Sequence, residues 1–371
     1  MPYITLVRPL LAFCFCAVLL SFEVSAQKVV LDLSPVENPA LVTDYRYTWV
    51  LDHRIRKSDI GEVFESAGRK IPVTIQGNLE PSASRFFSGS ILPIDSAEKE
   101  IQVRILELEL TEKFNPETEL YEGDMQLGLG FYVIGSFDPV HLLDYAGSIQ
   151  YQRSGFRMDR VETVLNKLFS NSLVYFDSWI KSQALNTRAL AKTFRLDIIE
   201  QDKVSTGEKV FYDPGRPLVW GDFKARPSPG SRNNATIFTS FSLEGISLMD
   251  SGSVVQTLEL NVYMLPMQSW VRTPNDYGLN HEQRHFDIVR IVADRLIYRL
   301  ENADLSLDFY QAQINEAYLD AYREMNRLQE LYEKGVNHGL DPEGQQRWNG
   351  WIDEALTGDW GRIEVLLQSP R

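Results

Sequence analysis

Apolar and polar residues alternate along several stretches of the first half of the chain. Alternation with a period of two is typical of β-strands that bury one face against a core. The turn-forming segment Asn115-Pro116-Glu117 separates two of these stretches, so we predict that they form a hairpin. The predicted strands are residues 28–33, 45–50, 101–110 and 125–133.

A helical period follows these strands. In residues 158–181 the apolar positions recur every three or four residues, which predicts an amphipathic helix packed on the sheet. His53 and His141 stand alone in this half, and we expect both to be structural or at the surface. The polar, turn-rich segment 201–209 indicates a domain boundary, which we place at residue 205. Residues 27–205 are therefore predicted to form an α+β accessory domain without catalytic residues.

The second half of the chain contains two further predicted strands and then three helices. A short loop near Asn302 joins the first two helices, which makes them antiparallel. Asp341-Pro342 has the residues favoured at a helix N-terminus and predicts the start of the third helix. We therefore expect an α+β fold, with residues 206–371 as its second domain. The predicted strands are 236–243 and 254–265, and the two long helices are 277–300 and 306–334.

Composition narrows the classes of function. The chain has 371 residues and a formal net charge of −14, and we expect no nucleic-acid partner, because binding to nucleic acid depends on Lys and Arg at the phosphates. Arg8, the apolar run 10–20 and Val24-Ser25-Ala26 predict an export signal, residues 1–26, that is cleaved after Ala26. Lipid attachment at Cys14 is the alternative, but a bulky Phe13 precedes that cysteine.

The export signal limits the chemistry of the mature protein. Both cysteines, Cys14 and Cys16, lie within the signal, so no thiol remains for a disulfide or for catalysis. No later segment has the roughly 20 apolar residues that a transmembrane helix needs. We therefore expect a periplasmic or secreted protein in which a zinc site would use histidine and carboxylate ligands.

His281-Glu282-Gln283-Arg284-His285 has the HExxH pattern of zinc metallopeptidases. At helical spacing the two imidazoles can bind one metal ion, and Glu282 beside them can take a proton from a metal-bound water. The same helix face continues through Ile288, Val292 and Leu296, so the histidines lie on a buried stripe. Buried polar groups are costly unless they are satisfied, and a metal ion satisfies them. The alternative is a plain hydrogen-bonded cluster.

A catalytic zinc site commonly has three protein ligands, so the third must come from another segment. Glu316 is two residues past Ile314 of the apolar stripe, roughly 200° around the helix, and should face solvent. His338 follows the end of that helix, and the antiparallel pairing brings it back toward the first histidine. Pairing the helices about their loop instead places Glu324 nearest His281. His338 and Glu324 are therefore both candidate third ligands.

Several linked motifs extend over residues 211–351. They are Trp220-Gly221-Asp222-Phe223, Ser269-Trp270-Val271, His281-Glu282-Gln283-x-His285-Phe286-Asp287, and Tyr332 followed by His338-Gly339, with Gln346 and Trp348 after them. In this order they resemble a bacterial family described as predicted secreted zinc-dependent proteases. The resemblance implies an exported protein with a zinc-type site and favours His338 over Glu324 as third ligand. It does not extend to the N-terminal half.

Four residues depart from the pattern of that family. Arg284 stands where glycine is expected, Gly335-Val336 replaces a Glu-Thr pair, and Glu333 stands where aspartate is usual. If the Glu-Thr pair orients the metal ligands, its loss alters the site. If the pair only caps the helix, the site is unaffected.

The motifs together predict an exported zinc metallopeptidase, with a zincin-like second domain, that acts on a protein or peptide substrate. His281, His285 and His338 would bind Zn²⁺, and Glu282 would act as general base. The alternative is a non-catalytic periplasmic binding or assembly protein with a structural or vestigial metal site, whose N-terminal domain docks an envelope partner. Candidate donors to the oxyanion are Tyr277, Arg284, Tyr318 and Tyr332.

Overall fold

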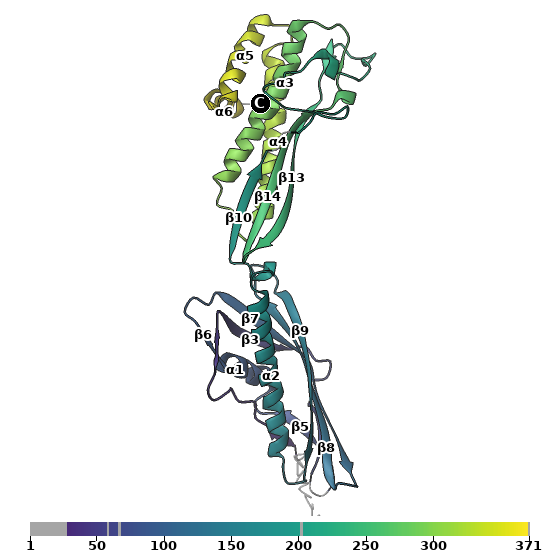
Figure 1. Cartoon of the computed structure of the whole chain (residues 1–371), viewed down its shortest axis with the longest axis vertical. Helices are drawn as coiled ribbons and strands as arrows, with labels where there is room; N and C mark the ends of the chain where they lie inside the picture. The colour runs from purple at the N-terminus through teal and green to yellow at the C-terminus, as the bar shows by residue number, and fades with distance from the viewer. Residues whose placement is uncertain (1–27, 58, 66–67, 201–202, 370–371) are drawn as a thin grey trace, which may run out of the picture. The chain divides into compact units, whose positions relative to one another are not determined.

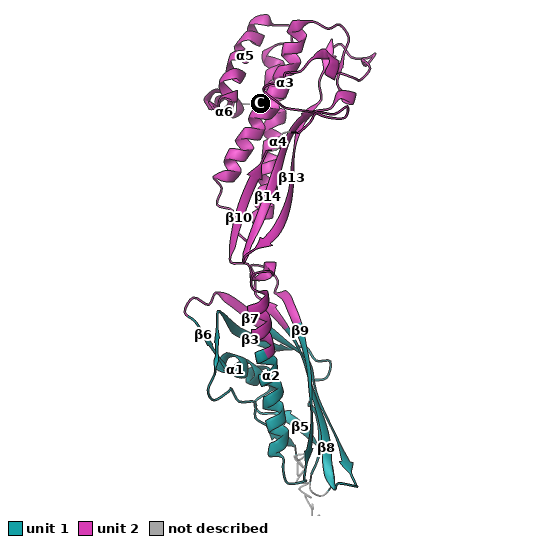
Figure 2. Cartoon of the chain, viewed as in Figure 1, with its two compact units in different colours: residues 1–94, 103–130, 144–174 teal, residues 95–102, 131–143, 175–371 magenta. Residues whose placement is uncertain are grey.

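The computed structural model describes residues 28–57, 59–65, 68–200 and 203–369 (Figure 1). The expected export signal, its cleavage site and Cys14 lie outside these residues. The mixed α+β fold class is confirmed. The chain divides into two compact units, which are described separately below. Figure 2 colours the first unit, made of residues 1–94, 103–130 and 144–174, and the second, made of residues 95–102, 131–143 and 175–371.

The N-terminal half is built on a seven-stranded sheet. Its strands run in the order β1 (Val29–Leu31), β5 (Lys70–Ile75), β4 (Gly61–Phe64), β7 (Lys99–Asn115), β8 (Leu120–Val133) and β9 (Val140–Arg153), and β3 (Tyr45–Asp52) also pairs with β7. The four predicted strands are present, and β7 and β8 form the predicted hairpin. In its turn the Asn115 side chain accepts a hydrogen bond of 2.9 Å from the Glu117 backbone.

Two helices accompany this sheet. α1 (Leu79–Gly89) lies between β5 and β6 (Ile91–Pro93), and β6 pairs with β2 (Leu41–Thr43). α2 (Asp159–Gln183) is the predicted amphipathic helix, and Phe176 on it stacks on Phe131 of β8 with ring centroids 4.3 Å apart. His53 and His141 are both exposed, in agreement with the expectation for lone histidines.

β14 (Ser253–Met264) is the central strand of the second sheet. It pairs with β13 (Thr239–Asp250) and β11 (Val210–Phe211) in antiparallel fashion and with β10 (Thr193–Ile199) in parallel. A separate pair joins β12 (Ala235–Thr236) to β15 (Trp270–Val271). All of β10 lies before the boundary expected at residue 205. Its alternating Phe194, Leu196 and Ile198 are the signal that the sequence analysis overlooked.

Four helices complete the second unit: α3 (Asp276–Glu301), α4 (Tyr310–Gly335), α5 (Pro342–Leu356) and α6 (Gly361–Gln368). α3 packs against β13, β14 and α4 (Figure 1). The Asp341 side chain accepts a hydrogen bond from the Glu343 backbone, which confirms the predicted start of α5. In the part of the chain that the structure describes, no helix is long and apolar enough to cross a membrane.

The loop between α3 and α4 is longer than the sequence analysis assumed. α4 begins at Tyr310 rather than at residue 306, so residues 302–309 connect the helices and shift their register. As a result, the Glu324 carboxylate contacts Arg295 Nε at 2.6 Å and Arg299 NH1 at 2.7 Å on α3. The expectation that Glu324 lies nearest His281 was therefore wrong. Glu316 is exposed, as expected.

Candidate metal centre

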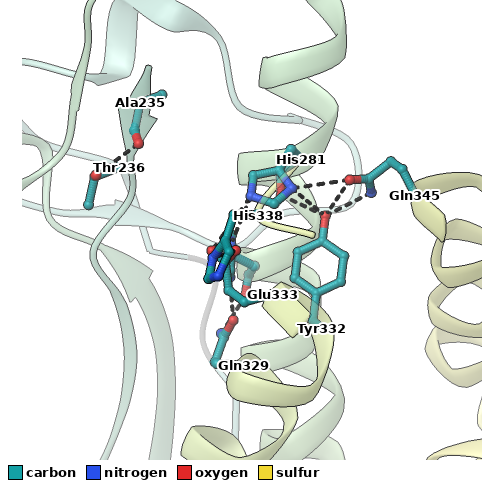
Figure 3. Close-up of polar contacts among 9 residues, drawn as sticks. Ala235, Thr236, His281, Gln329, Tyr332, Glu333, His338 and Gln345 are labelled. Atoms are coloured by element: carbon teal, nitrogen blue, oxygen red, sulfur yellow. Dashed lines mark hydrogen bonds and ion pairs between the residues drawn. The ribbon is translucent and has the colours of Figure 1, made fainter. Parts of the chain in front are cut away.

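Three ligand-type side chains meet where the start of α3 faces the end of α4. His281 and His285 lie one turn apart on α3, and Glu333 lies in the last turn of α4. The His285 Nε2 atom is 3.0 Å from Glu333 Oε1 and 3.3 Å from His281 Nε2, and His281 Nε2 is 3.7 Å from the same carboxylate oxygen. These three atoms lie within 4.8 Å of one another. Figure 3 shows His281 and Glu333 with their polar contacts.

The three converging atoms suit a divalent cation. A neutral imidazole nitrogen without its proton and a carboxylate oxygen are all acceptors, so they can face one another only if a proton or a cation lies between them. Two histidines and one glutamate form a known ligand set of catalytic zinc. Among the residues that the structure describes, no other group of three His, Cys, Asp or Glu side chains meets in this way.

Amide oxygens hold the far side of both imidazole rings. The His285 Nδ1 atom contacts Gln329 Oε1, and the amide nitrogen of Gln329 donates to the His285 carbonyl at 2.9 Å. The His281 Nδ1 atom lies 3.1 Å from Gln345 Oε1 and 3.0 Å from the Tyr332 hydroxyl (Figure 3). An amide oxygen only accepts, so it places the ring proton on Nδ1 and leaves the Nε2 lone pair for a metal.

The pKa shifts of His281 and Glu333 favour a proton that the two side chains share. Burial disfavours the charged form of His281, but its hydrogen bond with Glu333 and the charge of Glu282 raise its pKa above the ordinary 6.5. Burial also opposes ionisation of Glu333, yet the hydrogen bonds from His281 and His285 hold the pKa of this carboxyl far below its usual range. A bound cation would take the place of that proton.

Glu282 lies beside this group on a wall of a cleft. Burial raises the pKa of its carboxyl, while the two histidines act in the opposite direction, and the Ile237 backbone N–H donates a hydrogen bond to it. The cleft has a volume of roughly 1180 Å³ and is lined by residues 232–239, the start of α3, the end of α4 and residues 338–340. His281, Glu282, His285 and Glu333 all line it.

His338 lies next to the ligand group but not within it. Its Nδ1 atom is 3.0 Å from Glu333 Oε2, on the far side of the carboxylate, and its side chain is 73% exposed. The reason is the chain reversal after α4, where Asn337, His338 and Gly339 all have positive φ and the His338 N–H donates to the Glu333 carbonyl at 2.9 Å. The structure thus places Glu333 where the sequence analysis expects His338 as third ligand.

Of the residues that depart from the family pattern, Glu333 belongs to the ligand group, whereas Arg284 and Gly335 face α5. The Arg284 guanidinium contacts Asn349 and Asp353. A Cβ added at Gly335 would lie 2.2 Å from Trp348 Nε1, so only glycine fits this contact. Val336 is fully buried, and its N–H donates to the Tyr332 carbonyl. The Gly335-Val336 pair therefore ends the helix and packs, and does not orient the ligands.

The four candidate oxyanion donors have different surroundings. The Tyr332 hydroxyl contacts His281 at Nδ1, not at the Nε2 atom that faces Glu333. The Tyr318 hydroxyl contacts the Phe241 carbonyl at 3.4 Å. Arg284 turns to α5. Of the four, Tyr277 alone lines the cleft.

The comparisons with known proteins add little to this geometry. No protein-family model matches the sequence, and the comparison with curated proteins found no relative. A crystal structure of a Xanthomonas campestris protein of the DUF330 family is 14% identical to this chain, with a TM-score of 0.28, over 43% of this chain and 99% of that protein. At this TM-score the likeness supports no statement about fold or function.

Proposed function

We propose that the second unit is a zincin-like metallopeptidase that binds Zn²⁺ through His281, His285 and Glu333. The observation that carries the proposal is the convergence of both Nε2 atoms and one Glu333 oxygen within 4.8 Å, with the Nδ1 atom of each ring facing an amide oxygen. Three protein ligands beside an open cleft leave a coordination position for water and substrate, as catalytic rather than structural zinc sites do.

Glu282 is the general base in this proposal. A zinc ion at the site would lower the pKa of a bound water and polarise the scissile carbonyl. Glu282 would take a proton from the water that attacks the scissile carbonyl and deliver it to the leaving amine as the C–N bond breaks. Burial, which raises the pKa of this carboxyl, brings it nearer to neutral pH and so makes it a better base. The Ile237 N–H holds the carboxylate in the cleft wall.

The cleft suits an extended peptide beside residues 234–238. The Asn234 carbonyl accepts from the Arg272 N–H at 2.7 Å, and the Phe238 carbonyl accepts from the Leu265 N–H at 2.9 Å. In extended backbone the alternate residues, Ala235 and Ile237, point the other way, and the Ile237 N–H accordingly reaches Glu282. A peptide added along this edge would pass the metal ligands and the base.

The pattern of residues 1–26 supports export of this enzyme to the periplasm or the medium. The test is N-terminal sequencing of the mature protein from the envelope fraction, which should begin at Gln27. A mature protein that still begins at Met1 would contradict export by a cleaved signal.

Replacement of the base tests the reaction. We expect Glu282→Gln to retain zinc and to lose hydrolysis of an unfolded protein substrate by a factor of about 10³, because general-base catalysis contributes about that much. Glu316→Gln is the matched control, since it changes an exposed glutamate on α4 outside the cleft. Turnover that survives Glu282→Gln would overturn the mechanism. Zinc in the wild type without any hydrolysis would favour the non-catalytic binding or assembly protein.

A further inference from the structure

Arg284 has no part in the proposed reaction, yet its side chain is only 14% exposed. Its NH1 group donates to Asp287 Oδ2 at 3.1 Å and to Asp353 Oδ1 at 2.6 Å, and its Nε donates to Asn349 Oδ1 at 3.1 Å. A guanidinium has donors only. The atom of Asn349 that faces Arg284 must therefore be the amide oxygen, and the amide cannot turn over while Arg284 is in place.

The fixed amide of Asn349 determines the orientation of its neighbour on α5. Gln345, Asn349 and Asp353 follow one another at intervals of four residues, so they share one face of α5. Asn349 Oδ1 also accepts from Gln345 Nε2 at 2.9 Å, and the Tyr332 hydroxyl accepts from the same nitrogen at 2.7 Å. Because the nitrogen of Gln345 is directed to these acceptors, its oxygen faces His281 Nδ1.

We propose that Arg284 sets the tautomer of His281 through Asn349 and Gln345, and so acts as a positioning residue for the metal ligand. The relay keeps the ring proton on Nδ1 and the lone pair on Nε2, toward Glu333. Without the guanidinium, the contact of Asn349 Nδ2 with the Asn280 amide oxygen at 3.0 Å remains, but an amide partner can itself turn over. Asn349 and Gln345 can then both turn over, and Gln345 offers its NH₂ group to Nδ1. The ring proton moves to Nε2, where it competes with the metal. The role in metal binding rests on the proposed function, whereas the tautomer itself does not.

His285 provides an internal control. Its Nδ1 atom faces Gln329 Oε1, and the amide of Gln329 is oriented by the carbonyl of His285 itself. A backbone carbonyl only accepts, so this orientation needs no help from another side chain. A change at Arg284 should therefore alter the tautomer of His281 and leave that of His285 unchanged.

The test is long-range ¹H–¹⁵N NMR of the metal-free full chain with ¹⁵N-labelled histidine, which shows for each ring whether Nδ1 carries a proton. The chain has five histidines, so each ring can be assigned by substitution. We expect Nδ1 to carry a proton in both His281 and His285 of the wild type, beside any proton that their Nε2 atoms share with Glu333. Arg284→Leu should remove the Nδ1 proton from His281 alone and weaken zinc binding about 10- to 100-fold. Arg323→Leu, an exposed arginine on α4, is the matched control and should change neither.

Two further variants separate positioning from folding. Asn349→Ala cuts the relay but leaves the contacts of Arg284 with Asp287 and Asp353, and should shift His281 in the same way. Asn349→Asp keeps an acceptor for both Arg284 and Gln345 and should retain the wild-type tautomer. His281 that keeps its Nδ1 proton in Arg284→Leu or Asn349→Ala would overturn the relay. A tautomer shift in a protein that binds no zinc would support the relay and overturn the proposed function.

Discussion

Both units bury a cluster of polar side chains, and the two clusters differ in how their hydrogen bonds are satisfied. In the first unit the side chains of Glu112 and Arg153 are both fully buried. Glu112 Oε1 accepts from the Tyr151 hydroxyl at 2.8 Å and from Arg153 Nε at 2.7 Å. Glu112 Oε2 accepts from Arg153 NH2 at 2.7 Å and from the Phe64 N–H at 2.9 Å. Donors and acceptors match, and the two charges cancel.

In the cluster of the second unit, only the Nδ1 atoms of the two histidines have hydrogen-bond partners that match them. The Nδ1 atoms of His281 and His285 have amide partners, but their Nε2 atoms and Glu333 Oε1 are acceptors that face one another. This arrangement needs a proton or a cation, and it lines a cleft. Burial of charge alone therefore does not identify a site. Convergence of acceptors does, because it leaves a place for a positive charge from outside the chain.

The largest effect on stability should come from breaking the buried ion pair between Glu112 and Arg153. We expect Arg153→Met to lower the free energy of unfolding by about 3–5 kcal/mol, because it leaves the Glu112 carboxylate buried without its partner. Chemical denaturation measures this change, and Arg69→Met, which removes an exposed ion pair, should cost less than about 1 kcal/mol. Zinc binding in the second unit should be unaffected. An equal small cost for both variants would contradict the distinction.

A change in the cluster of His281, His285 and Glu333 should alter the affinity for zinc. We expect Glu333→Gln to weaken zinc binding at least about 100-fold, or roughly 2.7 kcal/mol, because a neutral amide replaces a charged ligand. Titration calorimetry of the mature chain measures the affinity. Glu316→Gln again serves as the control on the same helix. Unchanged affinity in Glu333→Gln would remove this residue from the site.

Acidity should change the stabilisation by zinc in a defined direction. Because the pKa of His281 is raised, its protonated form stabilises the metal-free fold below about pH 6.5. This stabilisation is lost as the pH rises through the folded-state pKa. Because the pKa of Glu333 is lowered, its ionised form stabilises that fold above about pH 4.5. This stabilisation is lost as the pH falls. Zinc replaces the shared proton, so its effect on Tm should be larger at about pH 8 than at about pH 6. Thermal unfolding with and without zinc tests this, and a smaller effect at the higher pH would contradict it.

The smallest effect concerns His338. Its side chain is mostly exposed and lies 3.0 Å from Glu333 Oε2, so we expect His338→Ala to weaken zinc binding by less than about tenfold. The same titration as for Glu333→Gln measures it. A loss of 100-fold or more in His338→Ala would instead support the sequence-based expectation that His338 is a ligand.

The elements of the fold were largely predictable, because their signals are local. The apolar stripe of α4, which includes Tyr310, Ile314, Met325 and Leu328, is buried as its spacing predicts. The HExxH spacing likewise placed His281 and His285 on one buried face. β10 has the same alternation, but it lies directly before the turn-rich segment 201–209, whose composition indicates a boundary rather than a sheet.

The position of Glu333 as the third candidate ligand was not predictable in the same way, because it depends on the register between two helices. A few residues in the loop 302–309 decide whether Glu324 or Glu333 faces the histidines. The reversal after α4, which turns His338 to the far oxygen of Glu333, depends on three consecutive residues with positive φ, two of which are not glycine. The amide partners Gln329 and Gln345 come from two different helices, and no spacing in the sequence connects them with the motif.

The most direct test of the proposed zinc site is a crystal structure of the zinc-loaded mature chain, with anomalous diffraction recorded at the zinc edge. We expect one ion with His281 Nε2, His285 Nε2 and a Glu333 oxygen at about 2.0–2.2 Å, and a further position open to the cleft. An ion that is bound by His338 in place of Glu333, or no anomalous peak beside His281 and His285, would contradict it.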